Sequence, residues 1–365
     1  MPAGAVTSPC TSKTPLWRCP TGFRRAMINN TVESALTPAP ISSTSGAVVR
    51  VGFPKKEPRM TTLWQGMRCA AVVSVLAAVC ATGAPTLAAQ QDMADVVIET
   101  IELEGDLFML MGRGGNMGLS VGEDGAFLID DQFAPLTAKI QAAVAEVSDH
   151  PVRWVLNTHW HGDHTGGNEN LGEAGAMIVA HRNVYRRMNP AEFADLVGRS
   201  AQAPRAALPV VTFDEGVQFH WNGRHIRVTH IGTAHTDGDA IVHFPRANVF
   251  HMGDTFFRGR YPFVDVDSGG GVDGVIAAAN FVLEQSNDDT RIIPGHGELA
   301  SAEHLREYRD MLETVRLRVA SMVADGRSED EVVAAAPTSD LDATWGEDAG
   351  GRFVRAVYFS LTGGN

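Results

Sequence analysis

Cysteine is missing from most of this chain. Only four of the 365 residues are cysteine, and all four precede residue 90. They are Cys10, Cys19, Cys69 and Cys80. The rest of the chain can therefore form neither a disulfide framework nor a thiolate metal ligand. Because a lack of cysteine suits any compartment, the cellular location has to be inferred from another feature.

Positive charge is also scarce in the larger part of the chain. The formal net charge is −13 over all residues. Nine Lys/Arg against two Asp/Glu lie before residue 90, which leaves 21 Lys/Arg against 41 Asp/Glu after it. Lys139 is the only lysine in that larger part. Such an acidic body argues against a nucleic-acid-binding groove, and arginine would have to bind any anionic group of a substrate.

Long apolar segments are absent apart from one near residue 75. A run of about 13 apolar residues, 69–81, follows Met67-Arg68 and is followed by the small residues 88–89. This pattern is typical of a secretory signal, and the run is short for crossing a bilayer, although an uncleaved anchor is an alternative. We expect a signal peptide at 60–89, a non-native or disordered extension at 1–59, and a folded domain at 90–365. The domain would then be periplasmic or secreted, without a stable membrane anchor.

The segment 159–164 concentrates four potential metal ligands in six residues. They are His159, His161, Asp163 and His164. His159 and His161 are two positions apart, so both side chains point the same way in an extended backbone. Gly162 then permits a sharp bend, which lets the next two ligands face a second point. A predicted strand before the segment and glycines after it argue against a low-complexity tract. One loop can thus serve two neighbouring ions, which we predict to be two Zn²⁺, with Fe or Mn as alternatives.

Three further segments end a predicted strand with a possible ligand. They contribute His235, Asp254 and His296, each beside glycine or other small residues. Taken singly, such residues are often only part of a turn. Combined with 159–164, they make a strong set. Asp130 also follows a predicted strand, where by itself it indicates no more than a turn cap.

The hydrophobic pattern alternates between strands and helices from residue 93 onward. Helices are predicted at 134–147, 272–285 and 301–324. Strands are predicted at 96–103, 107–111, 118–121, 126–129, 152–156, 177–180, 210–213, 217–221, 225–230, 240–244, 248–252 and 291–294. Two strand-rich halves with helices outside predict an α/β fold, a four-layer αββα sandwich.

The His-x-His-x-Asp-His pattern and the three later ligands resemble the metallo-β-lactamase superfamily. The resemblance covers nearly all of 93–300 and implies that 90–365 is a metallo-β-lactamase-like hydrolase domain with two zinc ions between its sheets. It implies the following roles: His159, His161 and His235 bind the first metal, Asp163, His164 and His296 bind the second, Asp254 bridges both, and Asp130 orients a ligand.

The chain departs twice from lactamases that use a cysteine ligand. It has Asp254 in place of that cysteine, and His164 where those enzymes usually carry arginine. The Asp at 254 is similar to the bridging residue of glyoxalase II-like members. The spacing of the later ligands and the expected secretion are more similar to lactamases than to cytosolic glyoxalase II.

The resemblance implies a secreted zinc-dependent hydrolase in which a metal-bound hydroxide attacks a carbonyl. The expected bond is the β-lactam amide, so the activity would confer antibiotic resistance. Asp163 and Asp254 would act as catalytic residues by positioning the hydroxide and accepting its proton. One alternative is a hydrolase of lactones, thioesters or other esters. Another is a periplasmic metal-binding accessory protein without turnover, which the full ligand set disfavours because a structural zinc site needs only four ligands.

A small molecule is the expected partner, and no oligomeric state is predicted. Arg258 and Arg260 follow Asp254 closely and are candidates for clasping a carboxylate, or are solvated loop residues. Trp160 either lines the pocket or packs in the core. The glycine-rich segment 112–116 is a candidate flap over the site, and 269–271 a candidate hinge.

Overall fold

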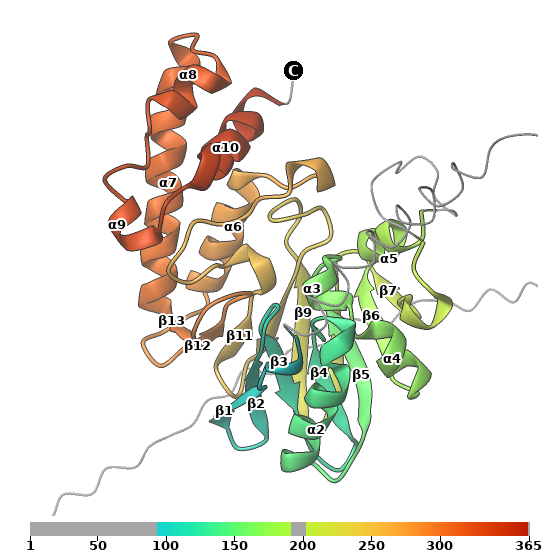
Figure 1. Cartoon of the computed structure of the whole chain (residues 1–365). Helices are drawn as coiled ribbons and strands as arrows, with labels where there is room; N and C mark the ends of the chain where they lie inside the picture. The colour runs from blue at the N-terminus through green and yellow to red at the C-terminus, as the bar shows by residue number, and fades with distance from the viewer. Residues whose placement is uncertain (1–92, 191–201, 364–365) are drawn as a thin grey trace, which may run out of the picture. The chain divides into compact units, whose positions relative to one another are not determined.

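The computed structural model describes residues 93–190 and 202–363, all within the unit formed by Cys69–Asn365 (Figure 1). The predicted extension at 1–59 and the predicted signal peptide at 60–89 lie outside the described residues. Within the described ranges, no helix combines the length and the apolar character needed to cross a membrane.

The first sheet is built from strands that follow one another in chain order. It starts with antiparallel pairs and continues with parallel pairs from β4 onward. Its strands are β1 Glu99–Glu104, β2 Leu107–Met111, β3 Met117–Ser120, β4 Ala126–Ile129, β5 Val152–Asn157, β6 Met177–His181 and β7 Val211–Phe213.

The second sheet has the order β13-β12-β11-β10-β9-β8. Only its β11–β12 pair is parallel. Its strands are β8 Gly216–Trp221, β9 Arg224–His230, β10 Ala240–Phe244, β11 Val249–His251, β12 Arg291–Ile293 and β13 Ala300–Ser301.

Helices cover the outer face of each sheet (Figure 1). The first sheet carries α2 Thr137–Val147, α4 Asn168–Glu173 and α5 Arg182–Met188. The second carries α6 Val272–Leu283 and α7 Ala302–Ala324, followed by α8 Glu329–Ala334, α9 Asp342–Trp345 and α10 Arg352–Thr362. The short elements are α3 Gly162–Thr165 and the 3₁₀ turns η1 Ala134–Leu136, η2 Arg205–Ala207, η3 Gly253–Thr255, η4 Val266–Ser268 and η5 Ala349–Gly351.

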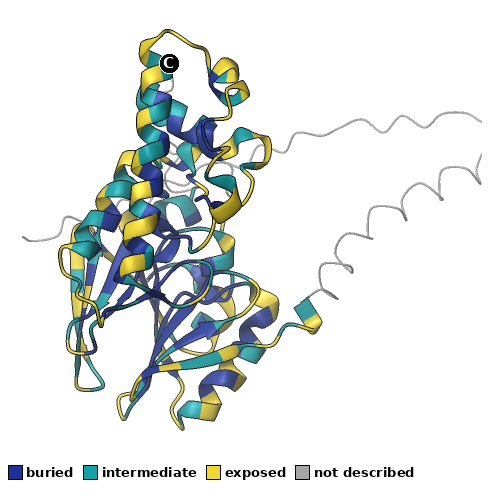
Figure 2. Cartoon of the chain, turned by 90° about the vertical axis from the view of Figure 1, so that its left-hand side faces the viewer, coloured by how far each residue is buried: buried dark blue, intermediate teal, exposed yellow. Residues whose placement is uncertain are grey.

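Three apolar cores separate these four layers. In β4, Phe127 and Ile129 face the second sheet, whereas Leu128 faces α2 and packs with Ile140. This alternation is the period-2 pattern of a strand that is buried on both faces. A third core fills the space between the second sheet and α6, α7 and α10, where Leu312 is fully buried. The central strands of both sheets are mostly buried, whereas α7 has an exposed outer face (Figure 2).

The structure confirms the predicted αββα sandwich, with one difference in its division. The strand predicted near 210–213 belongs to the first sheet, where β7 pairs with β6 in parallel. The boundary between the halves therefore falls between β7 and β8. Sequence patterning did not predict α4, α5 or the C-terminal helices α8 to α10, because these are short segments whose apolar faces depend on tertiary contacts.

His181 links the fold to a pH-dependent stability. It ends β6, accepts a hydrogen bond from Asn183 N at the start of α5, and stacks on His230 at a centroid distance of 3.8 Å. Burial, and then the nearby His230, lower the pKa of His181 to about 4. The unfolded chain takes up this proton near pH 6.5, whereas the folded chain resists it down to about pH 4. The free energy of unfolding is therefore expected to fall as the pH drops through that window.

The substitution H181N tests this linkage, because asparagine is a good N-cap but does not titrate. We expect urea denaturation with a chelator present to show a shallower loss of stability between about pH 6.5 and pH 4.5 in H181N than in the parent chain. The exposed His150, changed to asparagine, is the control. An equally steep pH dependence in H181N would contradict this assignment.

Candidate metal centre

The ligand-rich segment lies directly after β5, at the carboxyl end of a central strand. His161 precedes α3, and its carbonyl accepts hydrogen bonds from the backbone N–H groups of His164 and Thr165. Asn157 Nδ2 donates to the carbonyl of His164 at 3.1 Å. The short helix α3 places Asp163 and His164 in its single turn. The segment is thus a fixed turn whose side chains converge on one point.

The second sheet supplies the other three predicted ligands. His235 lies in the loop between β9 and β10, Asp254 lies in η3 after β11, and His296 follows β12. Gly295 allows the last two segments to approach, because a Cβ there would lie 2.1 Å from Asp254 Oδ1. The seven side chains form two groups suited to metal binding. The first group contains His159, His161, His235 and Asp254, and the second contains Asp163, His164 and His296.

The Asp254 carboxylate lies between the two groups. Its Oδ1 is 3.0 Å from His164 Nε2, and its Oδ2 is 3.4 Å from His296 Nε2, both in the second group. The same Oδ2 is 3.5 Å from His235 Nε2 and 3.9 Å from His159 Nε2, in the first group. This carboxylate is therefore in contact with both groups, as a bridging ligand would be.

Four of the five histidines have one ring nitrogen held by an oxygen outside the cluster. His164 Nδ1 lies 2.8 Å from Asp130 Oδ2, and Asp130 also accepts hydrogen bonds from Thr158 N and Oγ1. The other contacts are His159 Nδ1 to Thr158 Oγ1 at 3.0 Å, His235 Nδ1 to the carbonyl of Phe263 at 2.6 Å, and His161 Nε2 to Asp265 Oδ2 at 2.9 Å. Such outer contacts fix the ring orientation and leave the other nitrogen for a metal.

The electrostatics of the cluster suit metal binding as neutral imidazole at His159 and His235 and as ionised carboxylate at Asp254. Burial lowers the pKa of His159 well below its usual range and that of His235 to about 4. Burial opposes ionisation of Asp254, but the charges of His164 and His159 outweigh it and hold the pKa of Asp254 well below its usual range. For His164, burial is outweighed by the carboxylates of Asp254 and Asp130, which raise its pKa.

Three buried atoms indicate what the cluster is built to hold. His159 Nε2, His164 Nε2 and Asp254 Oδ1 have no hydrogen-bond partner among the described residues. The last two are close to each other but do not meet at hydrogen-bond angles. Buried polar atoms are normally satisfied. A cation beside these atoms would satisfy all three, and a set of imidazole and carboxylate donors fits zinc, with iron or manganese as alternatives.

A cleft of about 390 Å³ opens over the cluster. Asp163 and His296, the most exposed of the predicted second-group ligands, face it. Its remaining walls are largely aromatic, from Phe133, Phe257 and Phe263. Aromatic walls around charged ligands exclude water and strengthen electrostatic interactions within the cleft.

The structure separates the three predicted substrate-binding residues. Arg260 lines a larger cavity beside the cleft, with its guanidinium 5.6 Å from the centre of the Phe257 ring. Arg258 lines neither space: it donates to the carbonyl of Leu299 and lies 3.5 Å from Glu298. Trp160 does not line the cleft: it packs in a small apolar cluster around Val184, with its ring centroid 5.0 Å from that of His161.

The predicted flap and hinge are both held in place by hydrogen bonds. In 112–116, Gly115 N donates to the carbonyl of Asp163, and Asn116 N donates to the carbonyl of Gly295. In 269–271, Gly271 N donates to the carbonyl of Ala234. The glycines therefore allow close packing against the ligand loops, where the sequence had indicated mobility.

Asp265 is a residue that sequence patterning missed. We expect D265N to weaken metal binding about 10- to 100-fold, because the amide is a weaker acceptor for the His161 ring and no longer fixes its orientation. Competition with a fluorescent zinc chelator measures this affinity without any substrate. Asp267 in the same loop has an exposed side chain, so D267N is the matched control. Equal affinities of D265N and D267N would argue against an orienting role for Asp265.

Comparison with known proteins gives the family. A family model described as the metallo-beta-lactamase superfamily matches residues 110–296. The chain belongs to the metallo-beta-lactamase superfamily, a class of metal-dependent hydrolases. Two solved structures share its fold. A metallo-beta-lactamase from Pontibacter korlensis has a TM-score of 0.50 and 18% identity, and the match covers 59% of this chain and 99% of that one. The DIM-1 metallo-beta-lactamase has a TM-score of 0.50 and 16% identity, and the match covers 60% of this chain and 99% of that one.

The curated relatives with similar sequences include a hydroxyacylglutathione hydrolase and a lactamase-like protein. A hydroxyacylglutathione hydrolase of Anaeromyxobacter dehalogenans is 38% identical over 121 residues, which cover 31% of this chain and 43% of that protein. The lactamase-like protein aptB of Emericella nidulans is 26% identical over 231 residues, 61% of this chain and 64% of that protein. The chain thus spans less than two thirds of the length of either relative.

Proposed function

We propose that this chain hydrolyses a carbonyl bond of a small molecule at a dinuclear metal centre, formed by two zinc ions or, as alternatives, by iron or manganese. One observation carries the proposal: the Asp254 carboxylate contacts both ligand groups, a position that a mononuclear structural site does not require. The bound ions would supply Lewis acidity and lower the pKa of water to about 7.

The chain's own residues would hold the ions in place. His159, His161 and His235 would hold one ion, and Asp163, His164 and His296 the other. Burial opposes ionisation of Asp163, but its hydrogen bond with His296 lowers its pKa, so this carboxylate is ionised at neutral pH. It faces the cleft and can accept a proton there.

Two classes of carbonyl substrate follow from these features. The β-lactam amide is the first candidate, favoured by the expected periplasmic or secreted location, and it would give the chain a role in antibiotic resistance. Thioesters, lactones and other esters are the second candidate. The partial match to a hydroxyacylglutathione hydrolase and the aspartate at position 254 favour this second class.

A chelator-controlled panel tests the proposal on the purified full chain. Nitrocefin and other β-lactams, a set of lactones, and thioesters that include a hydroxyacylglutathione are assayed after zinc loading, after chelation and after zinc is restored. We expect turnover of one class that chelation removes and zinc restores. Stoichiometric metal binding without turnover of any class would overturn the proposal and favour the accessory protein.

A further inference from the structure

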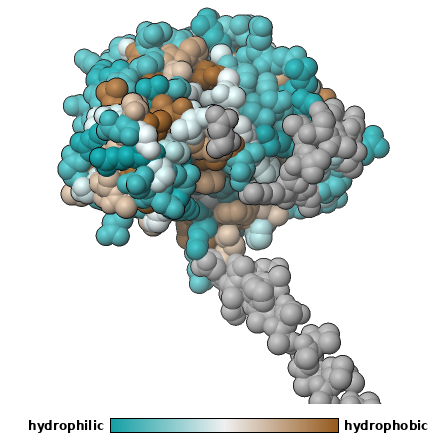
Figure 3. Space-filling view, turned by 90° about the horizontal axis from the view of Figure 1, so that it is seen from above, coloured by the Kyte–Doolittle hydropathy of each residue, from teal (hydrophilic) through white to brown (hydrophobic). Residues whose placement is uncertain are grey.

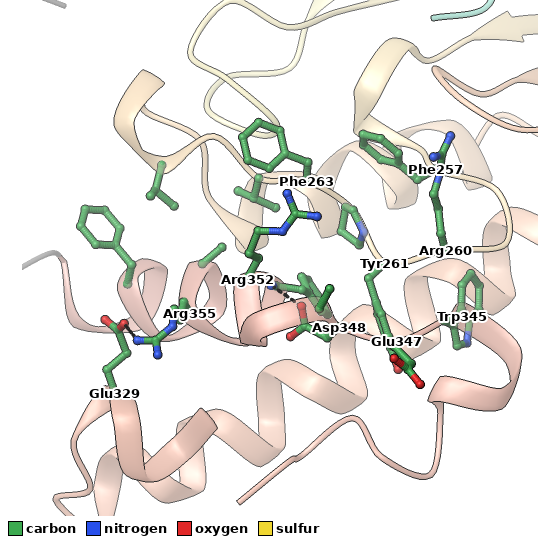
Figure 4. Close-up of a pocket in the computed structure, with 18 residues that line it drawn as sticks. Phe257, Arg260, Tyr261, Phe263, Glu329, Trp345, Glu347, Asp348, Arg352 and Arg355 are labelled. Atoms are coloured by element: carbon green, nitrogen blue, oxygen red, sulfur yellow. Dashed lines mark hydrogen bonds and ion pairs between the residues drawn. The ribbon is translucent and has the colours of Figure 1, made fainter. Parts of the chain in front are cut away.

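A second cavity, of about 560 Å³, lies beside the metal cleft (Figure 4). Phe257 and Phe263 line both spaces. The segment that carries Phe263 also contacts the cluster through the Phe263 carbonyl and Asp265. The cavity is therefore next to the reacting centre and shares its wall.

The walls of this cavity come from two distant parts of the chain. One wall is the segment after Asp254, and the other is formed by α9, α10 and the turn between them. The aromatic lining residues are Phe257, Tyr261, Phe263, Trp345, Phe353 and Phe359. Phe263 is 49% exposed and Phe359 is 39% exposed, and they are the only phenylalanines among the exposed large apolar side chains of the described residues.

In the view from above, apolar residues also gather within a largely hydrophilic face (Figure 3). Exposed aromatic side chains around a cavity are typical of a binding site for an apolar group.

The charged side chains of the cavity include an arginine without an acidic partner. Arg352, the first residue of α10, extends from its helix toward Phe263 (Figure 4). Within the described ranges it forms no ion pair, in contrast to Arg355, which pairs with Glu329 and Asp330. Arg260 likewise has no acidic partner in those ranges and lies over the Phe257 ring.

The lining of the cavity contains three arginines and three carboxylates, so its formal charge is balanced. Glu329 is paired with Arg355, and the Asp348 carboxylate accepts the backbone N–H groups of Phe353 and Val354. Glu347 is exposed at the edge. Arg260 and Arg352 thus have no carboxylate in ion-pair contact within the described residues, although the lining has no excess of positive charge. A guanidinium in an aromatic surrounding suits a carboxylate, which it can bind with two parallel hydrogen bonds.

We propose that this cavity binds the non-reacting arm of the substrate, an aromatic or alkyl group that carries a carboxylate, and that Arg352 recognises that carboxylate. The proposal deepens the proposed function and rests on it, because the bound molecule is a substrate only if the metal centre hydrolyses it. The metal centre would act on the carbonyl bond, whereas the cavity would select which carbonyl compounds reach it.

Calorimetry with 4-phenylbutyrate tests the cavity without any reaction. The full chain is titrated in its zinc-loaded form and after chelation. We expect binding in both forms, about tenfold weaker binding to R352Q, recovery in R352K, and weaker binding of the uncharged 4-phenylbutanamide. The matched control is R182Q, because Arg182 is an exposed arginine paired with Asp214 at the other side of the cluster loops.

Three results would overturn the proposal. One is equal affinity of R352Q and the parent chain for 4-phenylbutyrate. Another is binding that disappears on chelation, since the probe would then be a metal ligand. The third is a dimer that dissociates in the variant F263A, since a second copy of the chain would then cover the cavity.

Kinetics separate this proposal from the proposed function. Once the panel has identified a hydrolysed class, R352Q is expected to raise KM about tenfold for members that carry an aryl carboxylate, with kcat little changed. Unchanged KM overturns the cavity's role and leaves the hydrolase intact. Probe binding that depends on Arg352, without turnover of any class, supports the cavity and overturns the hydrolase.

Discussion

The substitution D254A is expected to remove hydrolysis almost completely and to lower the metal content of the zinc-loaded protein. Asp254 contacts histidines of both ligand groups, so its loss deprives both ions of a shared anionic ligand. Changes to outer partners of a metal site typically weaken it 10- to 100-fold, so we expect the loss of a ligand to exceed about 100-fold in activity. Metal analysis of the purified protein and the hydrolysis panel measure the two effects.

The control for D254A is D288A, which removes an exposed carboxylate from the turn before β12. D288A is expected to keep full metal content and activity. If D254A kept the parent's metal content and turnover, the bridging role would be refuted. Circular dichroism and thermal denaturation show whether the variant is folded, so loss of metal can be separated from loss of structure.

The second large effect is expected from a single added methyl group. In G115A the new Cβ would lie 2.1 Å from Cε1 and 2.4 Å from Nε2 of His164. That ring is fully buried and held by Asp130, so it cannot retreat without leaving its position. We expect a loss of stability of about 1–3 kcal/mol from overpacking, together with a large loss of zinc affinity.

The contrasting variant is G162A, within the ligand segment itself. No atom lies within 4 Å of a Cβ at Gly162, and the residue begins α3 with no need for a positive φ. G162A is expected to change the stability by less than about 1 kcal/mol and to retain zinc affinity. Zinc affinity and urea denaturation compare the two variants. If G115A kept the stability and zinc affinity of the parent chain and G162A lost them, the proposed close packing of Gly115 against His164 would be contradicted.

The ligand set was accessible from sequence because each ligand follows a recognisable strand. The apolar run before His159, and those before Asp254 and His296, predict strand ends, and the αββα arrangement then brings the seven side chains together. The spacing in 159–164 carried most of the information. Its local explanation was wrong in one respect: Gly162 does not provide a sharp bend, because a turn of helix turns Asp163 and His164 toward the cluster.

The remaining features depend on contacts between residues that are far apart in the chain. Asp265 lies 104 positions from His161, and nothing in its own neighbourhood indicates a metal-orienting role. Likewise, Gly115 looks like a mobile loop residue until the His164 ring is placed against it. The cavity near Arg352 required the C-terminal helices, and the packing of α10 on α6 and α7 has no short-range signature.

The division of the ligands between the sheets has a consequence for the whole fold. The ligands at 159–164 extend from the first sheet, and those at 235, 254 and 296 extend from the second. Ions bound between them would hold the two halves together, and each site would stabilise the folded chain by about 2.7 kcal/mol at a free metal concentration about 100 times its Kd. A body without cysteine would thus have a cross-link that a chelator opens and a reductant leaves intact.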